Sequence, residues 1–137
     1  TGGLFLLKPK STARRFGEAT SGNDTPTLHA FGATWLGNSN FKMEVSNASP
    51  SSTGVLILAL AEDNTPLQGL TLNVDLTQPH AVIPVTIDQN GDATVPIPIP
   101  NSLPTGVKSY WQAFVMDNAA PLSLSASQGL ETEIFAL

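Results

Sequence analysis

Prolines at alternate positions constrain the fold of this chain more than any other feature. Residues 92–100 read DATVPIPIP, so Pro96, Pro98 and Pro100 alternate with apolar β-branched residues. Alternate residues of a strand point their N–H groups toward the same lateral edge, and proline has no N–H group to donate. The segment is therefore predicted to be an outer strand with an unpaired proline edge. Such an edge guards against uncontrolled edge-to-edge association.

Short segments with strand periodicity follow one another along the rest of the chain. Apolar and polar residues alternate in residues 40–47, 70–76 and 130–136, which predicts strands with one buried face. Residues 55–61 (VLILALA) and 107–116 carry large apolar side chains on both faces, which is typical of central strands. Further strands are expected at residues 27–34, 81–87 and 122–126. Turns are expected at residues 62–66 and 88–92, where Asn90-Gly91 favours a tight hairpin.

This pattern predicts the fold class. About eight or nine short strands without a helix indicate an all-β, two-sheet antiparallel β-sandwich of immunoglobulin-like or jelly-roll topology. A chain of 137 residues suffices for one such domain. We assign residues 26–137 to the sandwich and residues 1–25 to an N-terminal apolar strand followed by a basic, polar linker.

The N-terminal segment has two interpretations. Leu4, Phe5, Leu6 and Leu7 form a short apolar run that ends at Pro9, and residues 10–25 show no periodicity. The run is either the first strand of the chain's own sheet or a donor strand that completes the sheet of a neighbouring subunit. A polar tether with nothing to bury favours the donor strand.

Charge is unevenly distributed. Lys8, Lys10, Arg14 and Arg15 are four of the six basic residues, whereas the chain from Glu18 onward carries all 11 acidic residues and a net charge of −9. An acidic body repels phosphate, so nucleic acid is not an expected partner. We expect the basic arm to dock on the acidic surface of a neighbouring copy, giving a homo-oligomer or polymer.

Several features suggest an extracellular protein. Only 12% of the residues are charged, and the chain begins at Thr1 rather than Met, as a mature secreted form would. Asn23 and Asn47 start weak N-glycosylation triplets. Cysteine is absent, which excludes disulfides and thiolate metal sites, and no apolar run is long enough for a membrane helix.

Five motifs follow one another along the chain. They are TPTL from residue 25, LGNSNF from residue 36, DATVPIPIP from residue 92, YWQAFVMD from residue 110, and AP at residues 120–121, which LS and GL follow. In these motifs residues 25–136 resemble an uncharacterised β-sandwich module of secreted proteins from Planctomycetes, myxobacteria and similar bacteria. The resemblance implies a secreted, non-catalytic domain and carries over no catalytic residue. Such modules usually contain a Cys before TPTL and another in the middle, and this chain has neither.

No catalytic residue or cofactor is predicted. His29 and His80 lack ligand-like spacing, and no serine lies in a G-x-S-x-G elbow. Asp88, Asn90 and Asp92 have the alternate spacing of a calcium loop but lack the bidentate Glu downstream, so a hairpin is favoured there.

Three functional hypotheses follow. The first is a non-enzymatic, secreted structural subunit that forms a filament or surface layer by N-terminal strand exchange. The second is an adhesion module that binds glycan or a cell surface, for which Trp35, beside Gly37 in a loop, is the candidate sugar-stacking ring. The third and least favoured is a hydrolase.

Overall fold

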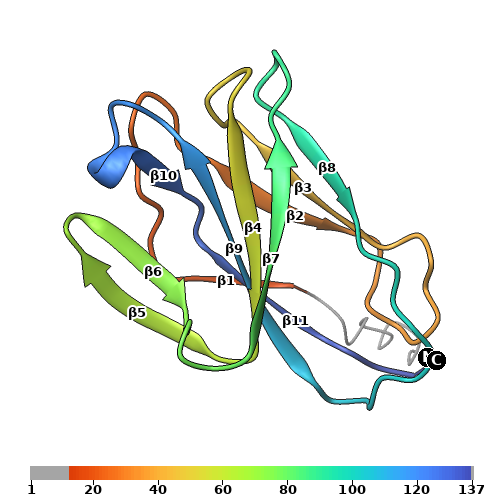
Figure 1. Ribbon diagram of the computed structural model, residues 1–137. Helices are drawn as coiled ribbons and strands as arrows, with labels where there is room; N and C mark the ends of the chain where they lie inside the picture. The colour runs from red at the N-terminus through yellow and green to blue at the C-terminus, as the bar shows by residue number, and fades with distance from the viewer. Residues whose placement is uncertain (1–12, 137) are drawn as a thin grey trace, which may run out of the picture.

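The computed structural model describes residues 13–136, which form antiparallel strands packed as a β-sandwich (Figure 1). The predicted all-β, antiparallel β-sandwich is confirmed, and a third, two-stranded sheet adds to the two that were expected. No helix in the described part of the chain has the length and apolar character needed to cross a membrane. The strands are β1 (Arg14–Phe16), β2 (Thr27–Phe31), β3 (Lys42–Ser46), β4 (Thr53–Ala59), β5 (Glu62–Leu67), β6 (Leu70–Val74), β7 (His80–Thr86), β8 (Ala93–Pro96), β9 (Lys108–Met116), β10 (Leu124–Ala126) and β11 (Gly129–Glu133), with a 3-10 turn η2 (Pro121–Ser123) before β10.

The larger sheet has the order β1-β11-β9-β4-β7, and β10 also pairs with β9. Strands β4 and β9 lie in its interior, as the apolar runs at residues 55–61 and 107–116 predicted. Every residue of β9 from Trp111 to Val115 is buried, so side chains on both faces of this strand are covered.

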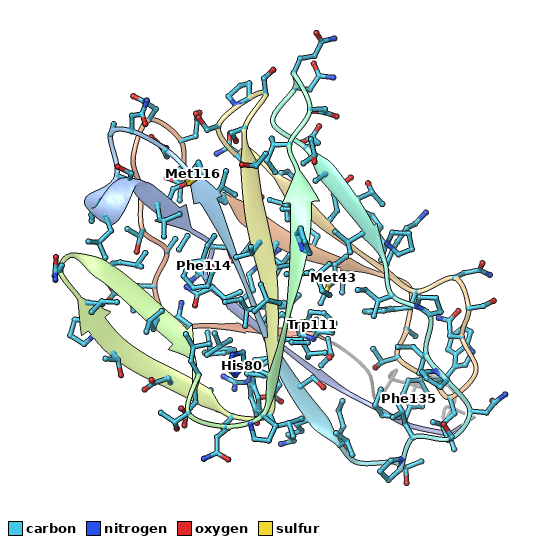
Figure 2. All side chains as sticks on the ribbon, in the orientation of Figure 1. Met43, His80, Trp111, Phe114, Met116 and Phe135 are labelled. Atoms are coloured by element: carbon cyan, nitrogen blue, oxygen red, sulfur yellow. The ribbon has the colours of Figure 1, made fainter. Side chains whose placement is uncertain are left out.

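The smaller sheet has the order β2-β3-β8 and covers one face of the larger sheet. Met43 and Val45 of β3 are fully buried against Leu56 of β4 and Trp111 of β9. Met43 and Trp111 are labelled in Figure 2. Burial of these alternating apolar residues is the main hydrophobic contribution to holding the two sheets together.

The hairpin β5–β6 covers the opposite face of the larger sheet and projects beside it in Figure 1. Leu70 and Val74 of β6 pack in a second apolar cluster with Ile57 of β4 and Phe114 of β9. This third layer explains why β4 and β9 need apolar residues on both faces.

The proline-rich segment is an edge strand, as predicted. Among the described strands, β8 pairs only with β3. Beyond β8 the same pattern continues, since Ile97 N–H donates to Phe41 O and Ile99 N–H to Asn38 O, each at 2.9 Å. The alternate positions, where proline stands, have no N–H to offer the other edge.

Part of the predicted linker is a strand. Residues 10–25 were expected to be a polar tether, but Arg14–Phe16 form β1 and pair antiparallel with β11. Phe16 packs edge-on against Tyr110, with ring centroids 5.9 Å apart. The linker prediction is wrong for these residues because a three-residue strand shows no periodicity, and its partner is far away in the sequence.

Two predicted turns also differ from the structure. Residues 62–66 were expected to turn, but Glu62–Leu67 form β5, because pairing with β6 outweighs the low strand propensity of Asp63 and Pro66. The turn at residues 88–92 joins β7 of the larger sheet to β8 of the smaller one, so it closes no hairpin ladder. Of Asn90 and Gly91, only Gly91 has a positive φ, at 85°.

Candidate docking groove

An apolar groove lies between the hairpin β5–β6 and the outer face of the larger sheet. Its floor is formed by Val55 and Ile57 of β4, Phe114 of β9, Leu124 of β10 and Leu70 of β6. Phe114 and Met116, labelled in Figure 2, lie on the same face of β9, two residues apart. The groove encloses roughly 430 Å³, within the range of about 300–1,000 Å³ typical of ligand pockets.

Exposed leucines and a methionine form the rim of this groove. Leu67, Leu76, Met116 and Leu122 are between 39% and 49% exposed, and they are four of the eight large apolar side chains exposed in the described chain. The only lining residues that are not large and apolar are Thr53 and Gly54. Contiguous apolar surfaces of this kind are typical of interaction sites, so the groove is a candidate docking surface.

A buried glutamine fastens the hairpin that forms one wall. Gln112 of β9 accepts a hydrogen bond at 2.8 Å from Asn73 N–H and donates bonds at 3.0 Å to the carbonyls of Thr71 and Ser127. Thr71 N–H donates to Thr20 Oγ1 at 3.1 Å. The edge of β6 that does not face β5 is therefore satisfied by side chains, and no additional strand is needed to pair with it.

The turn at the end of the groove has unusual backbone angles. Leu122 and Ser123 have φ values of 56° and 58°, in the left-handed region that costs non-glycine residues roughly 1–2 kcal/mol. Leucine has no polar group to stabilise that conformation, and its side chain is 46% exposed. The local fold therefore holds an apolar side chain at the rim at a cost in backbone energy.

Asp117 anchors the same turn. Its carboxylate accepts backbone N–H bonds from Asn23, Asp24 and Ala119 at 3.0–3.2 Å, and only 2% of the residue is exposed. Burial by itself would raise the pKa of Asp117, but the three N–H donors outweigh it, and the pKa lies below its ordinary value. The carboxylate joins residues 23–24 to the turn that carries Leu122.

The basic arm falls partly within the described chain. Arg14 was expected to contact a neighbour, but its Nε donates to Glu131 of the same chain at 3.1 Å and its Nη2 lies 3.4 Å from Glu62. Arg15 Nη2 donates to Leu28 O at 3.0 Å and contacts His29 Nδ1. Pairing of β1 with β11 brings both arginines onto their own body. Leu4, Phe5, Leu6, Leu7, Lys8 and Lys10 lie outside the described residues.

The outer edge of β11 is occupied beyond Glu133. The register of β1 on β11 would bring residues 10 and 11 opposite Phe135 and Ile134 if the ladder continued. At that point, however, Phe135 N–H donates to Thr34 O at 3.1 Å, and Leu36 N–H donates to Phe135 O at 2.9 Å. Residues 34–36 therefore use the backbone groups that an extension of β1 would need.

Trp35 is not the exposed platform that its loop position suggested. The residue is half-buried, and its ring packs edge-on against Phe135 with centroids 6.4 Å apart. The backbone bridge between Trp35 and Phe135 holds the ring in place. The sequence did not reveal this contact because the two residues are separated by most of the chain.

Residues 88–92, the weak calcium candidate, form a turn that is closed by its own hydrogen bonds. Asp88 Oδ1 accepts N–H bonds from Asn90 at 2.8 Å and from Asp92 at 3.0 Å. Among residues 13–136, no group of three or more His, Cys, Asp or Glu side chains is arranged to hold a metal ion. Asn23 and Asn47, the two glycosylation candidates, are both exposed.

The two histidines have separate surroundings. His29 contacts Arg15, and His80 Nδ1 lies 2.9 Å from Gln78 O. Both contacts involve neighbouring surface groups.

No family model, curated protein or solved structure matches this chain. The resemblance to a module of secreted bacterial proteins therefore stays a prediction.

Proposed function

We propose that this chain is a non-enzymatic, secreted structural subunit that assembles with copies of itself into a filament or surface layer. The N-terminal apolar segment of one copy, residues 4–7, binds the next copy. A contact of this kind joins two different surfaces, so it extends from subunit to subunit instead of closing a dimer.

The occupied edge of β11 carries the proposal. An apolar N-terminal run would most simply lengthen β1 in its own sheet. Residues 34–36 already bond Phe135 on that edge, so the ladder cannot continue past Glu133 without displacing them. The apolar run has to bury its side chains elsewhere, and a neighbouring copy offers a suitable surface.

Charge supports the same assembly. Lys8 and Lys10 follow the apolar run, and the chain from Glu18 onward has a net charge of −9. A basic segment and an acidic body attract each other in trans, which raises the association rate and orients the encounter. Assembly should therefore weaken as salt shortens the range of these attractions.

The prolines of the edge strand support assembly through the N-terminal segment, because they disfavour association of subunits at β8. Pro96 and Pro98 leave the free edge of β8 without N–H donors at their positions, so two sheets cannot easily join there. Association through the N-terminal segment then has little competition from β8 pairing.

Light scattering and negative-stain microscopy of three full-length chains test the proposal: the unchanged chain, Phe5→Asp, and the matched control Phe31→Asp, which changes an exposed phenylalanine on the smaller sheet. The unchanged chain and the control should form polymers, whereas Phe5→Asp should stay monomeric with an unchanged circular dichroism spectrum. A monomeric unchanged chain at high concentration and low salt would contradict the proposal.

A further inference from the structure

We infer that the apolar groove between the hairpin β5–β6 and the larger sheet is the acceptor site for residues 4–7 of a neighbouring copy. This inference rests on the proposed function and adds to it the surface that receives the segment. The occupant is a second copy of this chain, bound through its leucine and phenylalanine side chains.

The groove and the segment match in chemistry. Residues 4–7 read LFLL, four consecutive apolar side chains with no polar group among them. The groove has a floor of buried Leu70, Phe114 and Ile57 under a rim of exposed leucines. Burying such side chains removes apolar surface of both partners from water.

The contact is made by side chains and not by a backbone ladder. One edge of β6 pairs with β5, and the other is satisfied by Gln112 and Thr20. Strand β4 in the groove floor is paired on both sides, with β7 and β9. At β6 and β4 the groove therefore offers a surface for apolar anchors and no free strand edge.

Charge next to the groove matches the arm. Lys8 directly follows the apolar run, and Asp75 directly precedes Leu76 of the rim. The Thr77 hydroxyl and backbone N–H both donate to the carboxylate of half-buried Asp75, and these bonds lower its pKa. An ammonium group next to the segment in sequence and a carboxylate next to a rim residue in sequence favour one direction of binding.

The position of the hairpin favours a neighbour's segment over the chain's own. Leu70 and Leu72 line the groove from one face of β6, and Asn73 belongs to the other face. Asn73 Nδ2 donates to Glu18 O at 2.8 Å, so Glu18 lies on the side of β6 that is turned from the groove. Strand β1, which follows the N-terminal segment in the sequence, pairs with β11 at the edge of the larger sheet, and β11 separates it from β9 of the groove floor.

Leu122 provides a variant that separates binding from folding. In Leu122→Gly the positive φ is relaxed, since glycine adopts it freely, and one rim side chain is lost. A leucine with only a structural role would lower the melting temperature when removed. We expect an unchanged or higher melting temperature and an association weakened roughly 10-fold.

The absence of cysteine from the chain allows a direct test by cross-linking. Full-length Leu6→Cys is mixed with full-length Leu122→Cys under oxidising conditions, and separately with the control Phe31→Cys. Leu122 and Phe31 are 46% and 45% exposed, so the two acceptor cysteines are equally accessible. Disulfide-linked pairs should form with Leu122→Cys and not with Phe31→Cys.

The outcomes distinguish a wrong acceptor site from a wrong proposed function. If Phe5→Asp abolishes assembly but Leu6→Cys links to both acceptors equally or to neither, the proposed function stands and the groove is the wrong acceptor. If a chain carrying both Leu6→Cys and Leu122→Cys links mainly within itself at high dilution, the segment occupies its own groove, and the inference is overturned.

A fluorescent apolar probe tests whether the groove is filled in the assembly. 8-Anilinonaphthalene-1-sulfonate should bind the monomeric Phe5→Asp variant and be excluded from polymers of the unchanged chain. Equal binding to both would mean that the groove stays open for a small apolar ligand, and would overturn the inference. If the unchanged chain does not assemble at all, the proposed function fails with it.

Discussion

Gln112 of the central strand β9 accepts a hydrogen bond at 2.8 Å from the backbone N–H of Asn73 in β6. Both residues are fully buried. The bond connects the middle of the sandwich to the hairpin that forms one wall of the apolar groove. A single polar side chain inside an apolar strand therefore positions the candidate docking surface.

Gln112→Leu should destabilise the protein by about 2–4 kcal/mol, because it leaves Asn73 N–H and Thr71 O buried without their partner. Gln112→Glu should cost a similar amount, since a carboxylate oxygen would face two carbonyls. Urea denaturation measures both. The control Gln128→Leu changes an exposed glutamine and should stay within about 0.5 kcal/mol. Equal effects at both positions would contradict the role of Gln112.

Because of Asp117, the free energy of unfolding should depend on pH in the acid range. Its folded pKa lies below the ordinary value of 3.8, so the unfolded chain binds more protons as the pH falls through that region. The contribution of Asp117 to the free energy of unfolding is fully present above about pH 5 and is lost as the pH falls toward the folded pKa. Denaturation curves between pH 2.5 and 7 should show it.

Asp117→Asn should lower stability at neutral pH by about 1–3 kcal/mol, because an amide accepts three N–H bonds less well than a carboxylate. The variant should also lose part of the acid dependence. Glu18→Gln, which changes an exposed carboxylate, serves as control and should leave the acid dependence nearly intact. An unchanged pH profile in Asp117→Asn would refute the assignment.

Replacing prolines of the edge strand should promote aggregation. Pro96→Thr combined with Pro98→Thr restores two N–H donors on the free side of the strand. The double variant should scatter more light than the unchanged chain at equal concentration, even when it also carries Phe5→Asp. Pro104→Thr, in the following loop, should have no such effect. Equal scattering from both would mean that the prolines do not protect this edge.

Gly129→Ala should loosen β1. A methyl group at this position would overlap the ring of Phe16, which lies across Gly129 from the neighbouring strand. Overpacking of this kind costs about 1–3 kcal/mol. Because Phe16→Leu makes room for the methyl, the double variant should lose less stability than the sum of the single variants. Additive losses measured by urea denaturation would place the strain elsewhere.

Local patterns predicted much of the fold. The apolar runs of residues 55–61 and 107–116 indicated the central strands β4 and β9, and the prolines indicated the edge strand β8. Strand β1 and strand β5 were missed. Each depends on pairing that outweighs weak or unfavourable local preference, and a three-residue strand such as Arg14–Phe16 has no period to detect.

The candidate site was harder to predict. Leu67, Leu76, Met116 and Leu122 come from four separate segments, and each looks like an ordinary apolar residue in the sequence. The positive φ of Leu122 has no sequence signal, because leucine is not a turn former. Of the proposed contact, the sequence showed only the apolar run of residues 4–7.

The sequence by itself determined most of the strands, the two central strands β4 and β9, and the edge that cannot pair, because side-chain periodicity and missing N–H donors are local properties. The tertiary structure decided how the hairpin β5–β6 docks, where the apolar groove opens, and which residues close the outer edge of β11. These depend on contacts such as Gln112 with Asn73 and Phe135 with Thr34. The partners lie far apart in the chain, and only folding brings them within hydrogen-bonding distance.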